Sequence, residues 1–252
     1  MNAIGVFAAT RWEVEAVRQA FSGTETRLIG TVRCLIARRP HLDWWIIPMG
    51  VGPERAAATA RMVLAKQAFA AIWSTGFACA LRSANIGDVL MGTYATMSDD
   101  RPGPVAFPCT PAMIEWVRQN LENRNIALQV GPFVSVPQVL CRADEKREMA
   151  DRVGAIGLDM ESAALGLAAS ERQIPFGIVR TVSDLVDEDL PLDFNLFLRP
   201  SGWAKGVAAC LAHPTSLIGL NRLRRQSRSA GAQLTAVYRA FADLAGVEVM
   251  GC

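Results

Sequence analysis

The 252-residue chain has only two histidines, scattered cysteines and no long apolar run. Its six cysteines form no CxxC pair and no Cys/His cluster, so neither a metal site nor a disulfide framework is predicted. No uninterrupted apolar run approaches the ~18 residues of a membrane span, and no basic segment leads into an apolar one at the N-terminus. We therefore expect a soluble protein of the reducing cytoplasm.

Net charge is also small, because 26 basic residues face 24 acidic ones. A net charge of +2 gives no general reason to expect a nucleic-acid partner. The 51% hydrophobic content can bury a substantial core, and the length fits one large α/β domain about as well as two small ones; we favour one domain. We place this domain at residues 1–212 and expect residues 213–252 to form a helical extension packed on it.

Short apolar runs alternate with helical patterns along the chain. The strand-like runs cover residues 3–10, 43–50, 69–76, 88–97, 131–140, 155–160 and 175–184, and the helical patterns cover 53–67, 110–124 and 161–173. The runs mostly lack polar alternation, which is typical of strands buried on both faces. The pattern predicts an α/β fold with a mixed, mainly parallel sheet flanked by helices, and its Pro, Gly and Asp content predicts a loop over 97–108.

Three acids follow predicted strands, at the sheet edge where α/β folds bind ligands: Glu13, Glu161 and Asp184. Each also has a structural interpretation. Glu13 lies three residues after Thr10, which is the spacing of a helix capping box. Asp184 is placed to cap the turn after its strand, and Glu161 to sit half-exposed in a first helical turn.

Two glycine-bearing loops, at residues 48–58 and 73–81, follow strands as well. Glycines at such positions let a ligand approach backbone amides, and a helix beginning near Pro53 would direct its positive end to the same region. Tight turns also explain these glycines.

The order of these pieces resembles the nucleoside phosphorylase and nucleosidase superfamily, in particular the branch of methylthioadenosine/S-adenosylhomocysteine nucleosidases. The resemblance runs over roughly the first 200 residues, through "AIGVFAATRWEVEAV", "MGVGPERAAA", "STGFACAL", "LDMESAALGLAA" and "PFGIVRTVSDLVD". Within this superfamily the chain is most similar to the hopanoid-associated phosphorylases. The similarity lies in the sequence of the glycine loop, in "GFAC" and "LDMES", and in the basic tail.

The resemblance implies cleavage of an N-glycosidic bond through a cationic sugar. Asp184 matches the acid that protonates N7 of a purine, which requires a protonated or proton-sharing carboxyl. Glu161 matches the carboxylate that holds the ribose hydroxyls, and Met160 matches the residue beneath the ribose. Arg180 either orients these acids or is their structural counter-ion, and Asp159 serves the strand-to-helix junction. The implied substrate-binding residues are Met160, Phe77, Val139, Leu140, Ser183 and Arg180.

The nucleophile implied by the resemblance is water or phosphate. Glu13 matches a general base that positions water, whereas phosphorylases of this fold bind phosphate through arginines and a Ser or Thr hydroxyl. Here Ser74 takes the place of such an arginine and Phe77 that of the hydroxyl, although Arg11 is a candidate phosphate ligand. We favour water. Adenine is the expected base, with Val139 and Leu140 as its wall, and no metal or cofactor is implied.

The substrate expected from the resemblance is adenosylhopane, with a soluble nucleoside such as methylthioadenosine, or a non-catalytic nucleoside-binding protein, as the alternatives. A homodimer is expected, because the nucleosidase branch completes the 5′ end of its pocket from a neighbouring chain. The stretch 205–242 contains no acid and carries Lys205, Arg222, Arg224, Arg225, Arg228 and Arg239, with Leu234, Val237, Tyr238, Phe241 and Leu244 at helical spacing. This segment is either a docked helix with a solvated basic face or a peripheral contact with the inner membrane face.

Overall fold

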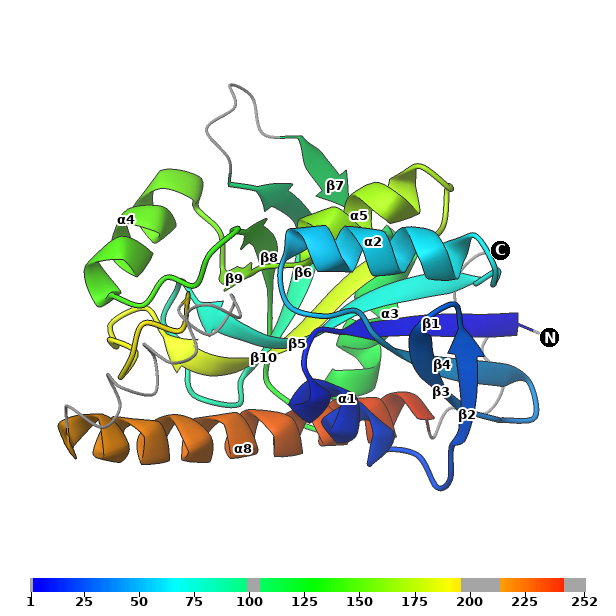
Figure 1. Ribbon diagram of the computed structural model, residues 1–252, viewed down its shortest axis with the longest axis horizontal. Helices are drawn as coiled ribbons and strands as arrows, with labels where there is room; N and C mark the ends of the chain where they lie inside the picture. The colour runs from blue at the N-terminus through cyan, green and yellow to red at the C-terminus, as the bar shows by residue number, and fades with distance from the viewer. Residues whose placement is uncertain (1, 99–104, 196–213, 243–252) are drawn as a thin grey trace.

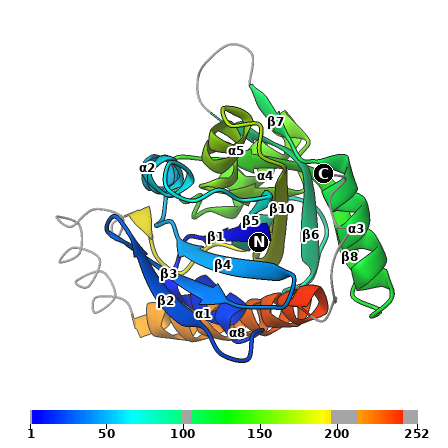
Figure 2. The same cartoon turned by 90° about the vertical axis from the view of Figure 1, so that its right-hand side faces the viewer.

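The structure is a computed structural model that describes residues 2–98, 105–195 and 214–242. One twisted sheet is enclosed between two layers of helices (Figures 1 and 2). The strands are β1 (Asn2–Ala8), β2 (Glu25–Ile29), β3 (Val32–Ala37), β4 (Leu42–Pro48), β5 (Ala71–Ala80), β6 (Val89–Met97), β7 (Ala106–Pro108), β8 (Leu128–Ser135), β9 (Gly157–Asp159) and β10 (Phe176–Leu185). The helices are α1 (Arg11–Arg18), α2 (Pro53–Leu64), α3 (Pro111–Glu122), α4 (Ala143–Val153), α5 (Ser162–Ser170) and α8 (Pro214–Ala242).

The sheet has the order β10-β6-β8-β9-β5-β1-β4-β3-β2, and β7 pairs with β6. Strand β10 pairs with both β6 and β5, so the five strands β10, β6, β8, β9 and β5 close on themselves. The predicted mixed α/β sheet is confirmed, but it is less parallel than the sequence indicated. In the described residues five pairings are parallel and five antiparallel. Strands β2, β3 and β7 return as hairpin-like neighbours, β10 meets β6 in the opposite sense, and β9 does the same with β5.

The predicted burial of strands on both faces is confirmed in β1 and β4. Residues Ala3–Ala8 of β1 are buried throughout. In β4 the neighbours Trp44 and Trp45 point to opposite faces and enter different cores. Helices α2 and α5 cover one of these cores, while α1, α3 and α8 cover the other. Since neither face of the central strands meets water, apolar residues fill consecutive positions.

Several segments differ from the sequence-based expectation. The antiparallel pair of β2 and β3 lies in a stretch to which we assigned no element. Helix α4 lies in a stretch to which we assigned no element, because its mostly charged sequence carries only a thin apolar stripe. Residues Ala106–Pro108, assigned to a loop, form β7 on the edge of β6, and most of the rest of that expected loop lies outside the described residues.

The described part of the expected C-terminal extension is the helix α8. Its second half buries Leu234, Val237, Tyr238 and Phe241, as their spacing predicts, whereas Lys205 and Leu244 lie outside the described residues. Thr235 donates a hydrogen bond to the carbonyl of Ala16 in α1, over 2.8 Å. No helix in the described residues is long and apolar enough to cross a membrane.

Candidate active site

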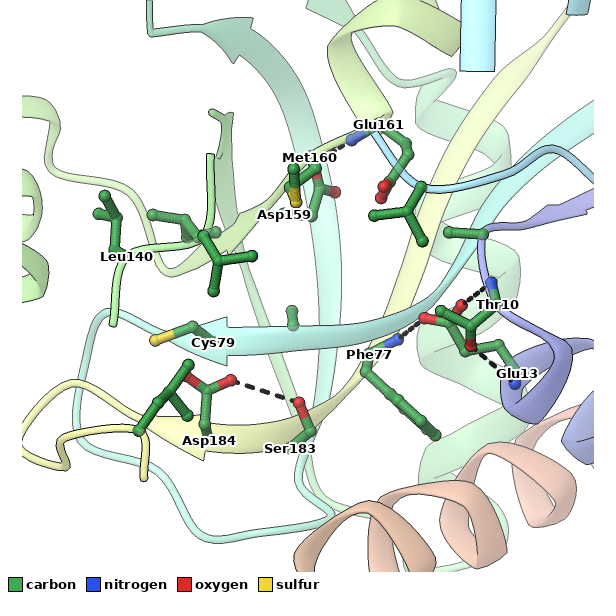
Figure 3. Close-up of a pocket in the computed structure, with 16 residues that line it drawn as sticks. Thr10, Glu13, Phe77, Cys79, Leu140, Asp159, Met160, Glu161, Ser183 and Asp184 are labelled. Atoms are coloured by element: carbon green, nitrogen blue, oxygen red, sulfur yellow. Dashed lines mark hydrogen bonds between the residues drawn. The ribbon is translucent and has the colours of Figure 1, made fainter. Parts of the chain in front are cut away.

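A cavity of about 160 Å³ opens at the carboxyl ends of β1, β5 and β10 (Figure 3). All three acids identified from the sequence line it, although they lie far apart in the chain. The other lining residues are Ala9, Thr10, Val51, Phe77, Ala78, Cys79, Val139, Leu140, Leu158, Asp159, Met160, Ser183 and Leu190. The lining side chains are mostly apolar and include no arginine or lysine.

Glu13 both caps α1 and reaches the cavity. The capping box predicted from its spacing is confirmed: the Glu13 amide donates to the Thr10 hydroxyl, and the Thr10 amide donates to Oε2 of Glu13 over 2.6 Å. The other carboxylate oxygen, Oε1, accepts a hydrogen bond from the amide of Phe77 over 2.7 Å. Two backbone donors therefore fix the orientation of a nearly buried carboxylate.

Gly76 makes this approach of Glu13 to β5 sterically possible. Its φ of 138° lies in a region that favours glycine, and a Cβ there would lie 2.1 Å from Oε1 of Glu13. The loop expected over 73–81 is instead almost entirely part of strand β5, and the glycine of "STGF" has a specific local role within that strand. It allows the carboxylate to pack directly against the backbone.

Glu161 is buried, which excludes the half-exposed position considered above. It is the N-cap residue of α5, and its Oε1 accepts a hydrogen bond of 2.8 Å from the amide of Gly52. Gly52 is itself the N-cap of α2, so the positive end of that helix faces Glu161, as expected from the glycine loop. Burial raises the pKa of Glu161 to about 7, against the lowering effect of nearby Arg180.

Arg180 lies beneath the cavity as the centre of a buried polar network. Its Nε forms an ion pair with Oδ2 of Asp159 over 2.8 Å, and its Nη2 lies 3.6 Å from Oε2 of Glu161. It also donates to the hydroxyl of Ser74 and to the carbonyl of Phe77. Asp159 accepts hydrogen bonds from the amides of Glu161 and Ser162, which confirms its role at the strand-to-helix junction.

Asp184 lies inside β10 and not at a turn after it, so its side chain does not act as a turn cap. The pairing of β10 with β5 shifts register between Val182 and Asp184, and such bulges redirect side chains. The carboxylate accepts from Lys146 Nζ over 2.8 Å at Oδ2 and from the Ser183 hydroxyl over 3.3 Å at Oδ1. Asp184 and Ser183 point toward one another at the cavity (Figure 3).

Lys146 is the site residue that the sequence analysis missed. It lies on the buried side of α4, three residues after Ala143 and three before Met149, and all three are buried. A lysine on this apolar stripe was the available signal. The pattern went unnoticed because the surrounding residues are mostly charged and exposed.

Val139 and Leu140, the two residues expected to form the wall beside the base, lie at the cavity, but the backbone amide and carbonyl of Val139 are already hydrogen-bonded. Val139 and Leu140 line the cavity together with Cys79 and Leu190. The amide of Val139 donates to Oδ1 of Asn195 over 2.8 Å, and the Val139 carbonyl accepts from Nδ2 of Asn195 over 2.9 Å. The Asn195 amide therefore presents to Val139 an acceptor beside a donor.

Phe77 directs its ring away from the acids toward α8 (Figure 3). A Cβ at Gly231 of α8 would lie 3.7 Å from the tip of this ring. The aromatic side chain is thereby packed against the C-terminal helix, whereas its backbone amide serves Glu13. Met160 lines the cavity next to Glu161, and its expected place beneath a ribose stays a prediction.

Arg11, the candidate phosphate ligand, lies outside the cavity. Its exposed side chain stacks over the ring of Trp12, with 5.0 Å between the guanidinium carbon and the ring centroid. Trp12 is itself 66% exposed, so the pair lies at the surface of α1. Among the described residues no group of histidine, cysteine or acid side chains is arranged to hold a metal ion.

Comparison with known proteins matches residues 3–204 to the family model of the phosphorylase superfamily. The 5′-methylthioadenosine/S-adenosylhomocysteine nucleosidase of Staphylococcus aureus strain JH9 is 25% identical over 210 residues, covering 78% of this chain and 92% of that protein. Two solved structures share the fold. Futalosine hydrolase of Helicobacter pylori has a TM-score of 0.77 at 14% identity (96% of this chain and 97% of that one). The S-adenosylhomocysteine nucleosidase of Streptococcus pyogenes, in complex with 5-methylthiotubericidin, has a TM-score of 0.76 at 18% identity (96% of each chain).

Proposed function

This chain belongs to the phosphorylase superfamily of nucleoside-cleaving enzymes, and we propose that it is a nucleosidase that releases adenine from a nucleoside by attack of water. The observation that carries the proposal is the convergence of three carboxylates, from Glu13, Glu161 and Asp184, on one mostly apolar cavity. N-glycosidic cleavage needs an acid for the leaving base, negative charge beside a cationic sugar and a base for the nucleophile.

Asp184 is the proposed general acid. A proton delivered to N7 makes the purine a neutral leaving group, so the electron pair of the glycosidic bond moves into the ring as the bond breaks. The carboxyl is held at one oxygen by Lys146, and its side chain is 15% exposed, so it remains accessible from the cavity.

Glu161 is the proposed ligand of the ribose hydroxyls and stabiliser of the cation. With a pKa near 7, the carboxylate is held by the Gly52 amide and is only partly neutralised by Arg180 at 3.6 Å. A cationic sugar forming beside it favours its ionised form. A negative charge in such a water-poor site stabilises the transition state more than it would in water.

Two features favour water over phosphate as the nucleophile. The cavity lining of the described residues holds no cation, and a phosphate dianion among three carboxylates would be strongly repelled. Residue 77 supplies no hydroxyl, and Arg11 stacks on Trp12 at the surface. Glu13, fixed by two backbone amides, is placed to accept a proton from a water that attacks the sugar.

The proposed substrate is an adenine nucleoside with an apolar 5′ substituent, of which methylthioadenosine is the first candidate. The curated relatives that match the chain favour this soluble nucleoside. The same fold is found in a futalosine hydrolase, so fold alone does not fix the 5′ group. Val51 and Met160 are among the apolar residues that line the cavity.

The test is incubation of purified protein with methylthioadenosine, S-adenosylhomocysteine and adenosine, with adenine measured by chromatography. Adenine released at equal rates with and without phosphate, together with a free reducing sugar, is the expected result. Formation of a sugar 1-phosphate would show that the nucleophile is phosphate and not water. Tight binding without turnover of any of these nucleosides would instead identify a nucleoside-binding protein on this fold.

A second candidate substrate is adenosylhopane, in which the nucleoside is attached to a membrane lipid. It is favoured by the exposed arginines Arg222, Arg224, Arg225 and Arg228 in the first half of α8. This half extends to the end of the molecule where α4 and the carboxyl end of β10 lie (Figure 1). A basic helix face is attracted to anionic lipid, which would bring the cavity to a membrane surface.

This candidate is tested by competition between adenosylhopane in anionic vesicles and methylthioadenosine in solution. Preferential cleavage of the lipid, with vesicle binding that weakens as salt rises, is the expected result. Preference for methylthioadenosine without vesicle binding at low salt would exclude the lipid as substrate and leave the basic face as solvated surface.

A further inference from the structure

Lys146 is a buried cation, and among the described residues its only charged hydrogen-bond partner is the proposed general acid. Its side chain is 1% exposed, and its ammonium donates to Oδ2 of Asp184 at 2.8 Å, to the Glu188 carbonyl at 2.9 Å and to the Leu185 carbonyl at 3.2 Å. An ammonium has three N–H donors, so these three acceptors satisfy it completely. The charge is therefore held in one place by α4 and by the segment that follows Asp184.

A buried lysine is costly unless it is paired, and its neighbours on the buried side of α4, Ala143 and Met149, are apolar. Met149, on the same face of the helix, fills its place with an apolar side chain. A role for the charge must therefore be sought in its partner. The partner reaches the cavity, and the lysine does not line it.

We propose that Lys146 is a positioning residue for the general acid: it holds Oδ2 of Asp184, directs Oδ1 to the purine and neutralises the carboxylate left after proton transfer. This inference rests on the proposed nucleosidase function. The lysine favours proton transfer from Asp184 to the purine, because the developing negative charge forms beside an ammonium that is already in place.

The proton balance of the step is closed. The O–H bond at Oδ1 of Asp184 breaks while N7–H forms, and the bonding pair stays on the oxygen. The glycosidic pair passes into the purine, which leaves as neutral adenine. Water forms the new bond to the sugar and gives one proton to Glu13. Before the next turnover Glu13 releases this proton to solvent, and Asp184 takes one up from solvent.

The groups around Asp184 make Lys146 the dominant charge. From β5, Cys79 lies opposite Asp184, and burial raises the pKa of its thiol well above the ordinary value, so it stays neutral. From the segment after β10, the Glu188 carboxylate accepts a hydrogen bond from Gln226 of α8. Glu13 and Glu161 lie across the cavity. Burial lowers the pKa of Lys146, but attraction to Asp184 outweighs this and leaves the pKa raised, so the lysine stays charged.

The experiment compares wild type, Lys146→Gln and Lys146→Arg, with Arg147→Gln as the matched control. Gln keeps hydrogen-bond donors but removes the charge, and Arg keeps the charge. Arg147 is the next residue of α4 and forms an exposed pair with Asp187, so its replacement removes a cation from the same helix without touching the acid. Thermal unfolding establishes that each variant is folded at the assay temperature.

The first readout is the pH profile of kcat/KM for adenine release from methylthioadenosine. For Lys146→Gln we expect the fall at high pH to move upward by about one pH unit or more, because the acid holds its proton more tightly without the neighbouring cation. We also expect kcat at the plateau to fall about 10²-fold. Lys146→Arg should keep the wild-type pH limb, and Arg147→Gln should match wild type in both quantities.

The second readout is a substrate whose leaving group departs without a proton, a 4-nitrophenyl riboside. A residue that serves acid delivery should matter little there, so Lys146→Gln and Lys146→Arg should lose far less on it than on methylthioadenosine. Equal losses on both substrates with an unmoved pH limb would overturn the proposal and leave Lys146 as a structural ion pair. If wild type itself releases no adenine, the proposed function fails, which is a separate outcome.

Discussion

The guanidinium of Arg180 and the carboxylate of Asp159 lie 2.8 Å apart, and both side chains are only 1% exposed. Replacing Arg180 by Met would leave Asp159 and Glu161 buried beside each other without a counter-ion. We expect Arg180→Met to lower the free energy of unfolding by about 3–5 kcal/mol, measured by urea denaturation.

The matched control for this prediction is Arg18→Met. Arg18 pairs with Glu15 over 2.6 Å on the exposed side of α1, so its loss should cost about 1 kcal/mol or less. Equal costs for the two variants would mean that the Arg180 network contributes no more than a surface pair.

Asp184→Asn should abolish adenine release while the fold is retained. An amide cannot supply the N7 proton, so kcat should fall by about 10²–10⁴-fold, with near-normal substrate affinity. Asp187→Asn, an exposed acid of the following turn, is the control and should turn over normally. Near-normal turnover by Asp184→Asn would refute its assignment as the acid.

Glu161→Gln should lower kcat more than it changes KM. The amide keeps an acceptor for the Gly52 amide and for ribose hydroxyls, but it loses the charge that stabilises the cationic sugar. A steady-state comparison of kcat and KM checks this split. A change in KM alone would make Glu161 a binding residue without a part in the chemical step.

Glu161 should also govern how stability depends on pH. Its pKa in the folded protein, about 7, is raised by burial above the ordinary 4.5, so the folded state binds the proton more tightly than the unfolded state. Protonation of Glu161 therefore adds at most about 3 kcal/mol to the free energy of unfolding. This stabilisation is fully present below about pH 4.5 and is lost as pH rises through 7. Urea unfolding of wild type from pH 4.5 to 8 should show this fall, and Glu161→Gln should lack it.

A homodimer is the expected oligomeric state, with a neighbouring chain completing the 5′ end of the cavity. Sedimentation at the concentration used for activity assays checks it. A catalytically active monomer would contradict the expectation and would leave the 5′ group facing solvent or another segment of the same chain.

The sequence by itself determined the layered α/β fold and the three acids. Strands buried on both faces require consecutive apolar residues, so they are visible without any knowledge of their partners, and an acid directly after such a strand must lie at one edge of the sheet. The capping box of Thr10 and Glu13 is equally local, since both partners lie within one helical turn.

Only the tertiary structure decided which cations meet those acids. Lys146 and Asp184 are 38 residues apart and lie on different elements, and Arg11, two residues before Glu13, stacks outward on Trp12 instead of entering the cavity. Contacts between distant segments also decided how much of the sheet is antiparallel, where β7 pairs, and which residue binds the backbone of Val139. Pairing between distant segments depends on where each backbone passes in space, and a one-residue bulge such as that before Asp184 redirects a side chain without a distinctive mark in the sequence.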